Sequence, residues 1–174
     1  MQKDYFVSQN DLDIQKEYIQ KVNAILSTIY LDRLPKAFVH TYGCQGNVAD
    51  SEHIKGMLVE MGYELTDAIE SADFILYNTC AIREHAEDRV FGNVGAIKKL
   101  KNDNPLLKIA LCGCMMQQSH IAEKIKNSYP FVNLVFGTHV VHKLPELRSR
   151  TLEGKKRVFC IDESDGVIYW YVKQ

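Results

Sequence analysis

The chain has 174 residues, of which 46% are hydrophobic and 25% charged, and its formal net charge is −1. This length suits one sizeable core, and the composition is that of an ordinary globular protein. A nearly neutral chain has no overall attraction to nucleic acid, and apolar runs of about five residues exclude a membrane span, which needs roughly 20.

Residues 1–35 are predicted to form an N-terminal extension of the main domain. Asp4, Asp11 and Asp13 interrupt the stretch where a signal peptide would be apolar, which indicates a cytoplasmic protein whose cysteines stay reduced. From Leu12 to Tyr30 apolar residues recur at spacings of three and four, as on one face of an amphipathic helix. We expect this helix to pack onto the domain as an arm; docking of a partner is the alternative.

After residue 35 the sequence alternates between apolar strands and amphipathic helices. Strands are predicted at 36–42, 73–79, 107–112 and 132–136, with a short extended piece at 63–65, and helices at 50–61, 83–101, 117–126 and 140–149. Pro145 should kink or shorten the last helix. This alternation predicts an α/β fold: a doubly wound, mainly parallel sheet of about five strands with flanking helices, preceded by the N-terminal helical arm.

The last part of the chain, residues 151–174, is predicted to be a basic linker and tail. An aromatic run at 168–172 has the pattern of a strand. The region that leads into this tail is rich in cations, which is typical of a solvated linker; contact with phosphate groups is the alternative. Its basic residues are Arg148, Arg150, Lys155, Lys156 and Arg157.

Three cysteines each follow a predicted strand and precede a predicted helix. Cys44, Cys80 and Cys114 are 36 (80 − 44) and 34 (114 − 80) residues apart. Because the carboxyl ends of parallel strands meet at one edge of a sheet, we expect the three thiols to converge there. A helix N-terminus stabilises the thiolate that binds metal, and Gly43 and Gly113 allow the backbone to turn tightly before two of the cysteines.

Sulfur ligands favour zinc, copper(I) or an iron–sulfur cluster. Structural zinc normally takes four ligands arranged in close pairs, and the only close pair here is Cys112 with Cys114. Three separated thiolates instead suit a cubane cluster in which the fourth iron is open.

The other candidate ligands near these turns are given a different role. Cys112 lies within an apolar strand and is predicted to be a core residue, and Cys160 receives no role. His40, His53 and His85 are predicted to be polar neighbours or surface residues and not metal ligands.

The residues around the three cysteines resemble the motifs of a known family. They resemble, in the same order, the three signature motifs of the methylthiotransferases, a group of radical S-adenosylmethionine enzymes. The three stretches are Thr41-Tyr42-Gly43-Cys44-Gln45-Gly46-Asn47, Asn78-Thr79-Cys80-Ala81-Ile82-Arg83-Glu84, and Gly113-Cys114 with Gln117-Gln118. The resemblance covers residues 36–150, which it identifies as the N-terminal domain of such an enzyme. Gln45 and Asn47 after the first cysteine are most like the branch that modifies isopentenyl-adenosine beside the anticodon of tRNA.

This resemblance implies a set of cofactors. Cys44, Cys80 and Cys114 would hold an auxiliary 4Fe-4S cluster whose open iron carries the sulfur to be transferred. A second 4Fe-4S cluster, in a radical domain, would cleave S-adenosylmethionine, and a further S-adenosylmethionine would supply the methyl group. The complete enzyme would add a methylthio group to carbon 2 of isopentenyl-adenosine.

The sequence departs from the family in its extent. The C-x3-C-x2-C motif of the radical domain and the RNA-binding module are both missing. We therefore expect a fragment of a transferase that does not turn over alone. It would act with a radical domain in cis and with tRNA in the full-length enzyme.

Other functions are compatible with parts of this pattern. The enzyme could belong to the branch that acts on threonylcarbamoyl-adenosine or on a ribosomal protein. A zinc-binding module would use a histidine to complete its site, and a flavodoxin- or Rossmann-type module would bind a nucleotide, although no glycine-rich phosphate loop follows the first strand. A docking domain with buried, separated cysteines is the remaining alternative.

Overall fold

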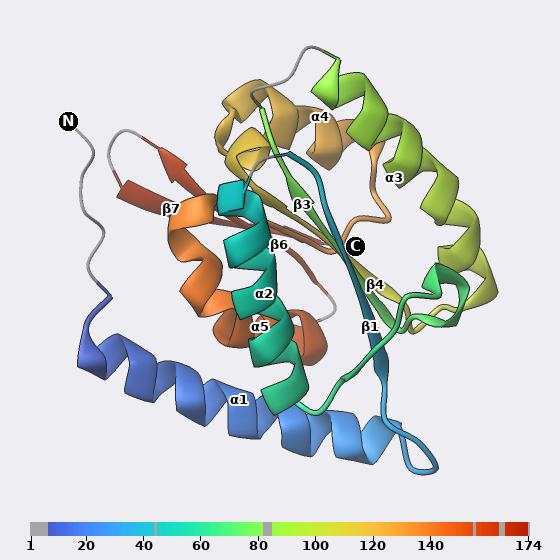
Figure 1. Ribbon diagram of the computed structural model, residues 1–174, viewed down its shortest axis with the longest axis vertical. Helices are drawn as coiled ribbons and strands as arrows, with labels where there is room; N and C mark the ends of the chain where they lie inside the picture. The colour runs from blue at the N-terminus through green and yellow to red at the C-terminus, as the bar shows by residue number, and fades with distance from the viewer. Residues whose placement is uncertain (1–6, 44, 82–84, 155, 164–165, 174) are drawn as a thin grey trace.

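The computed structural model describes residues 7–43, 45–81, 85–154, 156–163 and 166–173, with the backbone alone for Lys156, 162–163 and 166–173. Helices cover both faces of a central sheet, so that the chain forms three layers (Figure 1). The predicted doubly wound α/β class is therefore confirmed. In the described part of the chain, no helix is both long enough and apolar enough to cross a membrane.

The sheet has seven strands where about five were predicted. Its spatial order is β2-β1-β3-β4-β5-β6-β7, and every pairing is parallel except that of β6 with β7. The first five strands follow the flavodoxin-like order 2-1-3-4-5. The strands are β1 (Lys36–Thr41), β2 (Glu64–Leu65), β3 (Phe74–Thr79), β4 (Lys108–Gly113), β5 (Leu134–Phe136), β6 (Lys156–Glu163) and β7 (Gly166–Lys173).

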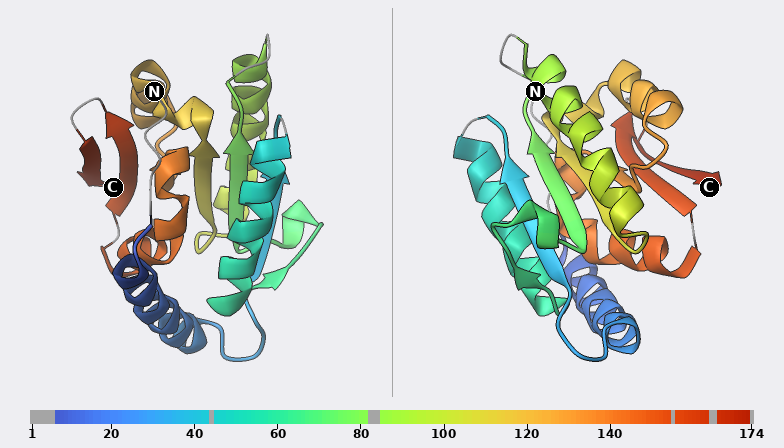
Figure 2. Two further views of the ribbon diagram at one scale, coloured as in Figure 1. Left: turned by 60° about the vertical axis from the view of Figure 1, so that its left-hand side comes forward. Right: turned by 90° about the vertical axis from the view of Figure 1, so that its right-hand side faces the viewer.

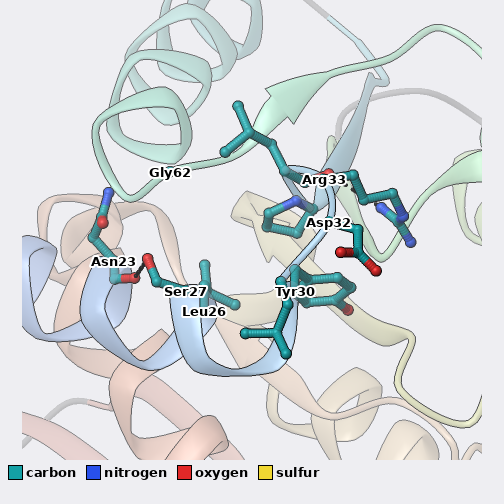
Figure 3. Close-up of a pocket in the computed structure, with 10 residues that line it drawn as sticks. Asn23, Leu26, Ser27, Tyr30, Asp32, Arg33 and Gly62 are labelled. Carbon is teal, nitrogen blue, oxygen red and sulfur yellow. Dashed lines mark hydrogen bonds between the residues drawn. The ribbon is translucent and has the colours of Figure 1, made fainter.

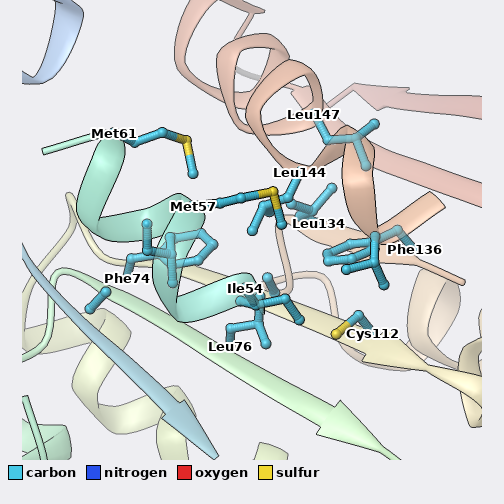
Figure 4. Packing of buried hydrophobic residues seen from close by; sticks show 14 of the residues in the cluster. Ile54, Met57, Met61, Phe74, Leu76, Cys112, Leu134, Phe136, Leu144 and Leu147 are labelled. Carbon is cyan, nitrogen blue, oxygen red and sulfur yellow. The ribbon is translucent and has the colours of Figure 1, made fainter. Parts of the chain in front are cut away.

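The helices divide between the two faces. Helices α1 (Gln9–Ile29), α2 (Gln45–Glu60) and α5 (Leu144–Gly154) contribute to the core on one face, and α3 (Ala86–Asp103) and α4 (Ser119–Ser128) to the core on the other (Figure 2). On the first face, Ile54 of α2 and Leu144 of α5 converge on Phe74, Leu76 and residues of the neighbouring strands (Figure 4). Side chains alternate along each strand, so each central strand feeds both cores.

The N-terminal arm is an integral part of the fold. Ser8 and Asp11 form a reciprocal capping box at the start of α1, which satisfies backbone N–H groups that a helix start leaves unpaired. Val22 and Leu26 are buried in the core beneath the helix. The predicted packing of this helix as an arm is confirmed.

Two helix boundaries differ from prediction. Helix α2 begins at Gln45, directly after the first cysteine position, where a start at residue 50 was predicted. The predicted helix over 140–149 is divided: residues Thr138–Lys143 form a 3₁₀ segment, and α5 begins at Leu144. Pro145 therefore lies in the first turn of α5, where its missing N–H has no intrahelical partner to lose.

The predicted basic linker is wrong for the described residues, because this region belongs to the fold. Residues up to Gly154 lie in α5, and β6 pairs in parallel with β5. Arg148 and Arg157 are only 3% and 2% exposed. Arg148 donates to the Tyr63 hydroxyl and to Thr151, so these cations bind protein oxygens instead of water.

Candidate metal centre

The carboxyl edge of the sheet contains the turns that carry the three cysteine motifs. The connection after β1 leads into α2 on one face, and the connection after β3 leads into α3 on the other. Such a reversal opens a crevice between the two strands, which is where ligands bind in doubly wound folds. The turns after β1, β3 and β4 surround this point (Figure 1).

Cys80 and Cys114 are brought together at this edge. Cys80 directly follows β3 and is 3% exposed, and Cys114 is the first residue of a 3₁₀ segment after β4. The Ala81 N–H donates to the Cys114 Sγ at 3.3 Å, and the Cys80 thiol lies within hydrogen-bonding reach of the same sulfur. Two thiols that are 34 residues apart in the sequence are therefore neighbours in space.

Burial dominates the titration of Cys114. It raises the pKa of the thiol, the adjacent Cys80 thiol raises it further, and the Ala81 N–H opposes both effects. The predicted help from helix N-termini is wrong for Cys80, because α3 begins at Ala86, six residues later. The N–H of Ala81, and not the first turn of α3, is the group that the described residues direct at this pair of sulfurs from the end of β3.

Cys44 lies outside the described residues. The preceding residue, Gly43, is described and packs tightly against Cys80. A Cβ added at Gly43, whose φ is +104°, would lie 2.3 Å from the Cys80 Cβ and 2.8 Å from its Sγ. Only a residue without a side chain fits there, so the turn after β1 closely approaches the turn after β3.

Gly113 produces a second close approach at this edge. Its φ of 103° and ψ of −179° lie in a region that is essentially reserved for glycine. A Cβ at this position would lie 2.2 Å from the Thr79 carbonyl oxygen. The absence of a side chain lets the end of β4 close onto the end of β3, which positions Cys114 beside Cys80.

Two buried asparagines connect the first two turns. The Asn78 side chain donates to the Asn47 carbonyl at 2.8 Å and to the Ser51 hydroxyl at 3.0 Å. In return, the Asn47 side chain donates to the Thr79 carbonyl at 2.8 Å. The motif contained both asparagines, but their pairing was not predicted. Because both are buried, this crossed pair holds the start of α2 against the end of β3.

The other candidate ligands do not complete a site. Cys112 is fully buried in the core with Leu134 and Phe136, as predicted, and His40, His53 and His85 are exposed. Among the residues that the structure describes, no three cysteine, histidine or acidic side chains are grouped to hold a metal. A three-ligand site at this edge therefore needs a ligand from outside them, and Cys44 is the cysteine that lies there.

A cavity of about 790 Å³ opens beside Cys80. Its lining includes Gly43 and Cys80 from the edge, Tyr42 from the end of β1, and Arg89 and Asn93 from α3. Sequence reasoning missed this cavity, although the alternation of aromatic residues along β1 was a usable signal. A second cavity, of about 440 Å³, lies at the opposite edge where α1 leads into β1, and it contains no cysteine (Figure 3).

Comparison with known proteins assigns the chain to a family. The family described as "Uncharacterized protein family UPF0004" matches residues 36–137, which is more than half of the chain. The chain belongs to the UPF0004 family. The UPF0004 match begins with β1 and includes all three cysteine positions at the strand ends.

Three relatives of this UPF0004 chain have the name tRNA-2-methylthio-N(6)-dimethylallyladenosine synthase. A protein from Caldicellulosiruptor saccharolyticus is 43% identical over 91% of this chain and 34% of its own length. Proteins from Clostridium perfringens and Acetivibrio thermocellus are 48% and 40% identical over 75% and 95% of this chain, and over 29% and 35% of their own lengths. The resemblance to methylthiotransferases is thus confirmed, and the chain spans about a third of the length of the relatives it matches.

Proposed function

We propose that this chain is the sulfur-ligand domain of a tRNA methylthiotransferase, in which Cys44, Cys80 and Cys114 hold an auxiliary 4Fe-4S cluster. The observation that carries the proposal is the meeting of Cys80 and Cys114 at the switch point of the sheet, with Gly43 packed against Cys80. Three thiolates from three different turns suit a compact inorganic cube better than a zinc site built from close pairs.

The chemistry of this edge fits such a group. Gly43 keeps a side chain away from the Cys80 sulfur, and Gly113 lets the turn before Cys114 close onto Thr79. The Ala81 N–H points to the Cys114 Sγ as hydrogen bonds to cluster sulfurs do. When bound, the cluster would supply an iron without a protein ligand as the place for the sulfur to be transferred. The protein's own part is to bind the group through thiolates and to fix its orientation.

In the longer protein, the proposed reaction adds a methylthio group to carbon 2 of isopentenyl-adenosine beside the anticodon of tRNA. The shared name of the relatives supports this branch over those that act on threonylcarbamoyl-adenosine or a ribosomal protein. S-adenosylmethionine and a second 4Fe-4S cluster would be bound by other parts of such an enzyme. Its tRNA substrate implies that it acts in the cytoplasm.

Anaerobic reconstitution with iron and sulfide tests the ligand set. We expect about four iron and four acid-labile sulfide ions per chain, with a broad visible absorbance. Cys44→Ala, Cys80→Ala and Cys114→Ala should each lower the iron content, whereas the matched control Cys112→Ala should not, because that thiol is in the core. Less than one iron per chain, or unchanged iron in Cys44→Ala, would contradict the proposal. One zinc per chain without sulfide would support the zinc module instead.

A further inference from the structure

An aromatic strip runs along one side of β1 toward the cysteine edge. Phe38, His40 and Tyr42 alternate along the strand and therefore share one side, and Tyr77 of β3 lies beside His40 in the sheet register. The rings are in contact: the His40 and Tyr42 centroids are 4.5 Å apart, and those of Tyr42 and Tyr77 are 5.6 Å apart. The rings thus form a continuous row of contacts, of which Tyr77 is the buried member, at 4% exposed.

This strip is only partly covered. Helix α3 lies beside β1 and not over it (Figure 2, right). It contacts the side of the strip: the Asn93 side chain donates to the Tyr42 hydroxyl at 2.6 Å, and Phe38 and Tyr42 pack against the core cluster that includes residues of α3. His40 is exposed, and Phe38 and Tyr42 are half-buried. The cavity beside Cys80 includes His40 and Tyr42 at the end of the strip, so a ligand lying along the strip would extend to Cys80.

The lining of this cavity favours a ligand that is both planar and anionic. Desolvation lowers the pKa of His40 and raises that of Tyr42. The positive charge of Arg89, which is exposed on α3 and lines the same cavity, is near enough to act on both groups in the lowering direction. The described lining includes Arg89, His40 and His85 but no carboxylate. A cation beside exposed rings is the combination that binds single-stranded nucleic acid, through phosphate contact and base stacking.

A protein partner is the less suitable occupant. Interface cores are rich in aliphatic and aromatic side chains, and Ala86 is the only aliphatic residue in the described lining. The large exposed aliphatic residues of the described chain lie elsewhere, for example Leu31 and Leu34 before β1 and Leu106 before β4. Polar atoms and rings dominate the cavity instead.

We propose that the β1 strip and its cavity bind a single-stranded segment of RNA, with bases stacked on His40 and Tyr42 and a phosphate paired with Arg89. The inference rests on the proposed function, because it supplies the route by which a loop nucleotide reaches the edge with Cys80 and Cys114. A base at the upper end of the strip lies in the same cavity as Cys80. The strip thereby selects unpaired nucleotides, whose ring faces are free.

The phosphate contact is tested by salt dependence. We would measure binding of a fluorescein-labelled RNA hairpin with an adenosine-containing single-stranded loop by anisotropy, from low to moderate salt. Arg89→Gln should weaken binding and reduce the log–log salt slope by roughly 0.7, the value for one phosphate contact on a single strand. The matched control is Lys98→Gln, an exposed charge nine residues along α3 and thus about half a turn from Arg89 around the helix.

The stacking contact is tested with 2-aminopurine in the loop, whose fluorescence is quenched when it stacks on a ring. His40→Ala should reduce affinity about fivefold or more and lose the quenching, while His40→Phe should retain both. His40 is exposed, so neither variant should impair folding, which circular dichroism would check. The inference is overturned if wild type does not bind the hairpin, or if Arg89→Gln and His40→Ala both behave as Lys98→Gln does.

Two further readouts separate the possible outcomes. If free AMP displaced the labelled hairpin as effectively as unlabelled hairpin does, the site would be a mononucleotide pocket, and the proposed binding of an RNA segment would be overturned. Iron reconstitution is measured on the same variants, and Arg89→Gln should keep the full iron content. If the protein takes up the full iron content but does not bind RNA, the proposed RNA-binding strip is refuted and the proposed cluster is retained. If the protein binds RNA but takes up no iron, the proposed cluster is refuted and the proposed RNA-binding strip is retained.

Discussion

Gly113 illustrates how one residue determines the geometry of the carboxyl edge of the sheet, where Cys80 and Cys114 meet. Its backbone angles are ones that other residues rarely adopt, and an added Cβ would meet the Thr79 oxygen at 2.2 Å and the Thr79 nitrogen at 2.7 Å. We predict that Gly113→Ala lowers the free energy of unfolding by about 3 kcal/mol, from backbone strain together with the clash. Urea unfolding followed by circular dichroism would measure the loss.

Gly95 provides the matched control for this substitution. It lies within α3, is exposed, and has no atom within 4 Å of an added Cβ. Gly95→Ala should therefore stabilise the protein by about 0.5–1 kcal/mol, because alanine loses less backbone entropy in a helix. If both substitutions had equal effects, the special role of the turn after β4 would be refuted.

At the scale of elements, Arg157 joins β6 to the end of α4. Its guanidinium donates to four backbone carbonyls, those of Ile125, Lys126, Tyr129 and Val132, at 2.7–3.1 Å. We predict that Arg157→Met lowers the free energy of unfolding by about 3 kcal/mol, because it removes four hydrogen bonds from a charged donor to buried backbone oxygens. Thermal and urea denaturation would both report the change.

The specificity of this contact can be checked with two more variants. Arg157→Lys should recover only a small part of the loss, since an ammonium group cannot reach four carbonyls as a planar guanidinium does. Arg150→Met removes a more exposed arginine that pairs with Glu146 and should cost less than about 0.5 kcal/mol. Full stability of Arg157→Lys would show that charge alone is sufficient.

A second connection between elements gives a pH dependence. Arg33, before β1, binds both oxygens of the buried Asp73 at 2.6 and 3.0 Å, and the Lys36 N–H donates to the same carboxylate. Burial alone would raise the pKa of Asp73, but these donors outweigh it and the pKa is lowered. The ion pair therefore stabilises the fold above the ordinary carboxyl pKa, and this contribution disappears as the pH falls through the lowered value.

We predict that Arg33→Gln is less stable than wild type by about 1 kcal/mol at pH 7, a modest loss because Arg33 is half-exposed to screening solvent. The difference should shrink below about pH 4 as the carboxyl becomes protonated in both proteins. Urea midpoints at several pH values would measure it. The exposed pair of Lys55 and Glu52 supplies the control, Lys55→Gln, for which little effect is expected at any pH. A gap that stayed constant down to pH 3 would argue against the ion pair.

For the whole molecule, hydrophobic periodicity was sufficient to predict the central layers. The apolar runs that became β1, β3, β4 and β5 are bounded by glycine, proline and asparagine, and each is followed by a helical pattern, so a parallel sheet was the natural solution. The rule that strand ends gather at one edge then located the cysteine turns. The proximity of Cys80 and Cys114 could therefore be predicted from the periodicity and this rule together.

The far side of the sheet could not be predicted in the same way. Arg148 and Arg157 are indistinguishable in sequence from solvated cations, because only the fold supplies the oxygens that they bind. Helices α3 and α4 each connect a strand to the next strand in the same direction along the sheet, and both lie on one face. The connection from β5 through α5 to β6 runs in this same direction, but α5 lies on the other face, together with α2. It therefore has the opposite hand, against the general preference for one hand.

The convergence of distant turns is a property of the whole fold, and a trivalent arsenical can test it directly. Phenylarsine oxide bridges two thiols only when both lie within a few ångström of the arsenic. We predict that the reduced chain binds one arsenical and that Cys80→Ser and Cys114→Ser abolish this binding. Native mass spectrometry would count the bound arsenic. Cys112→Ser should bind normally, because its thiol is fully buried in the core.

Cys44→Ser should also retain the arsenical, because the Cys80 and Cys114 pair remains, and this separates the result from iron binding. The pair is held by backbone contacts between the ends of β3 and β4, where Gly113 closes onto Thr79. The same Gly113→Ala that weakens the fold should therefore reduce arsenical binding even under conditions where the protein stays folded. Binding of wild-type strength in Cys80→Ser would mean that another thiol is the partner, and that the two strand ends do not bring these sulfurs together.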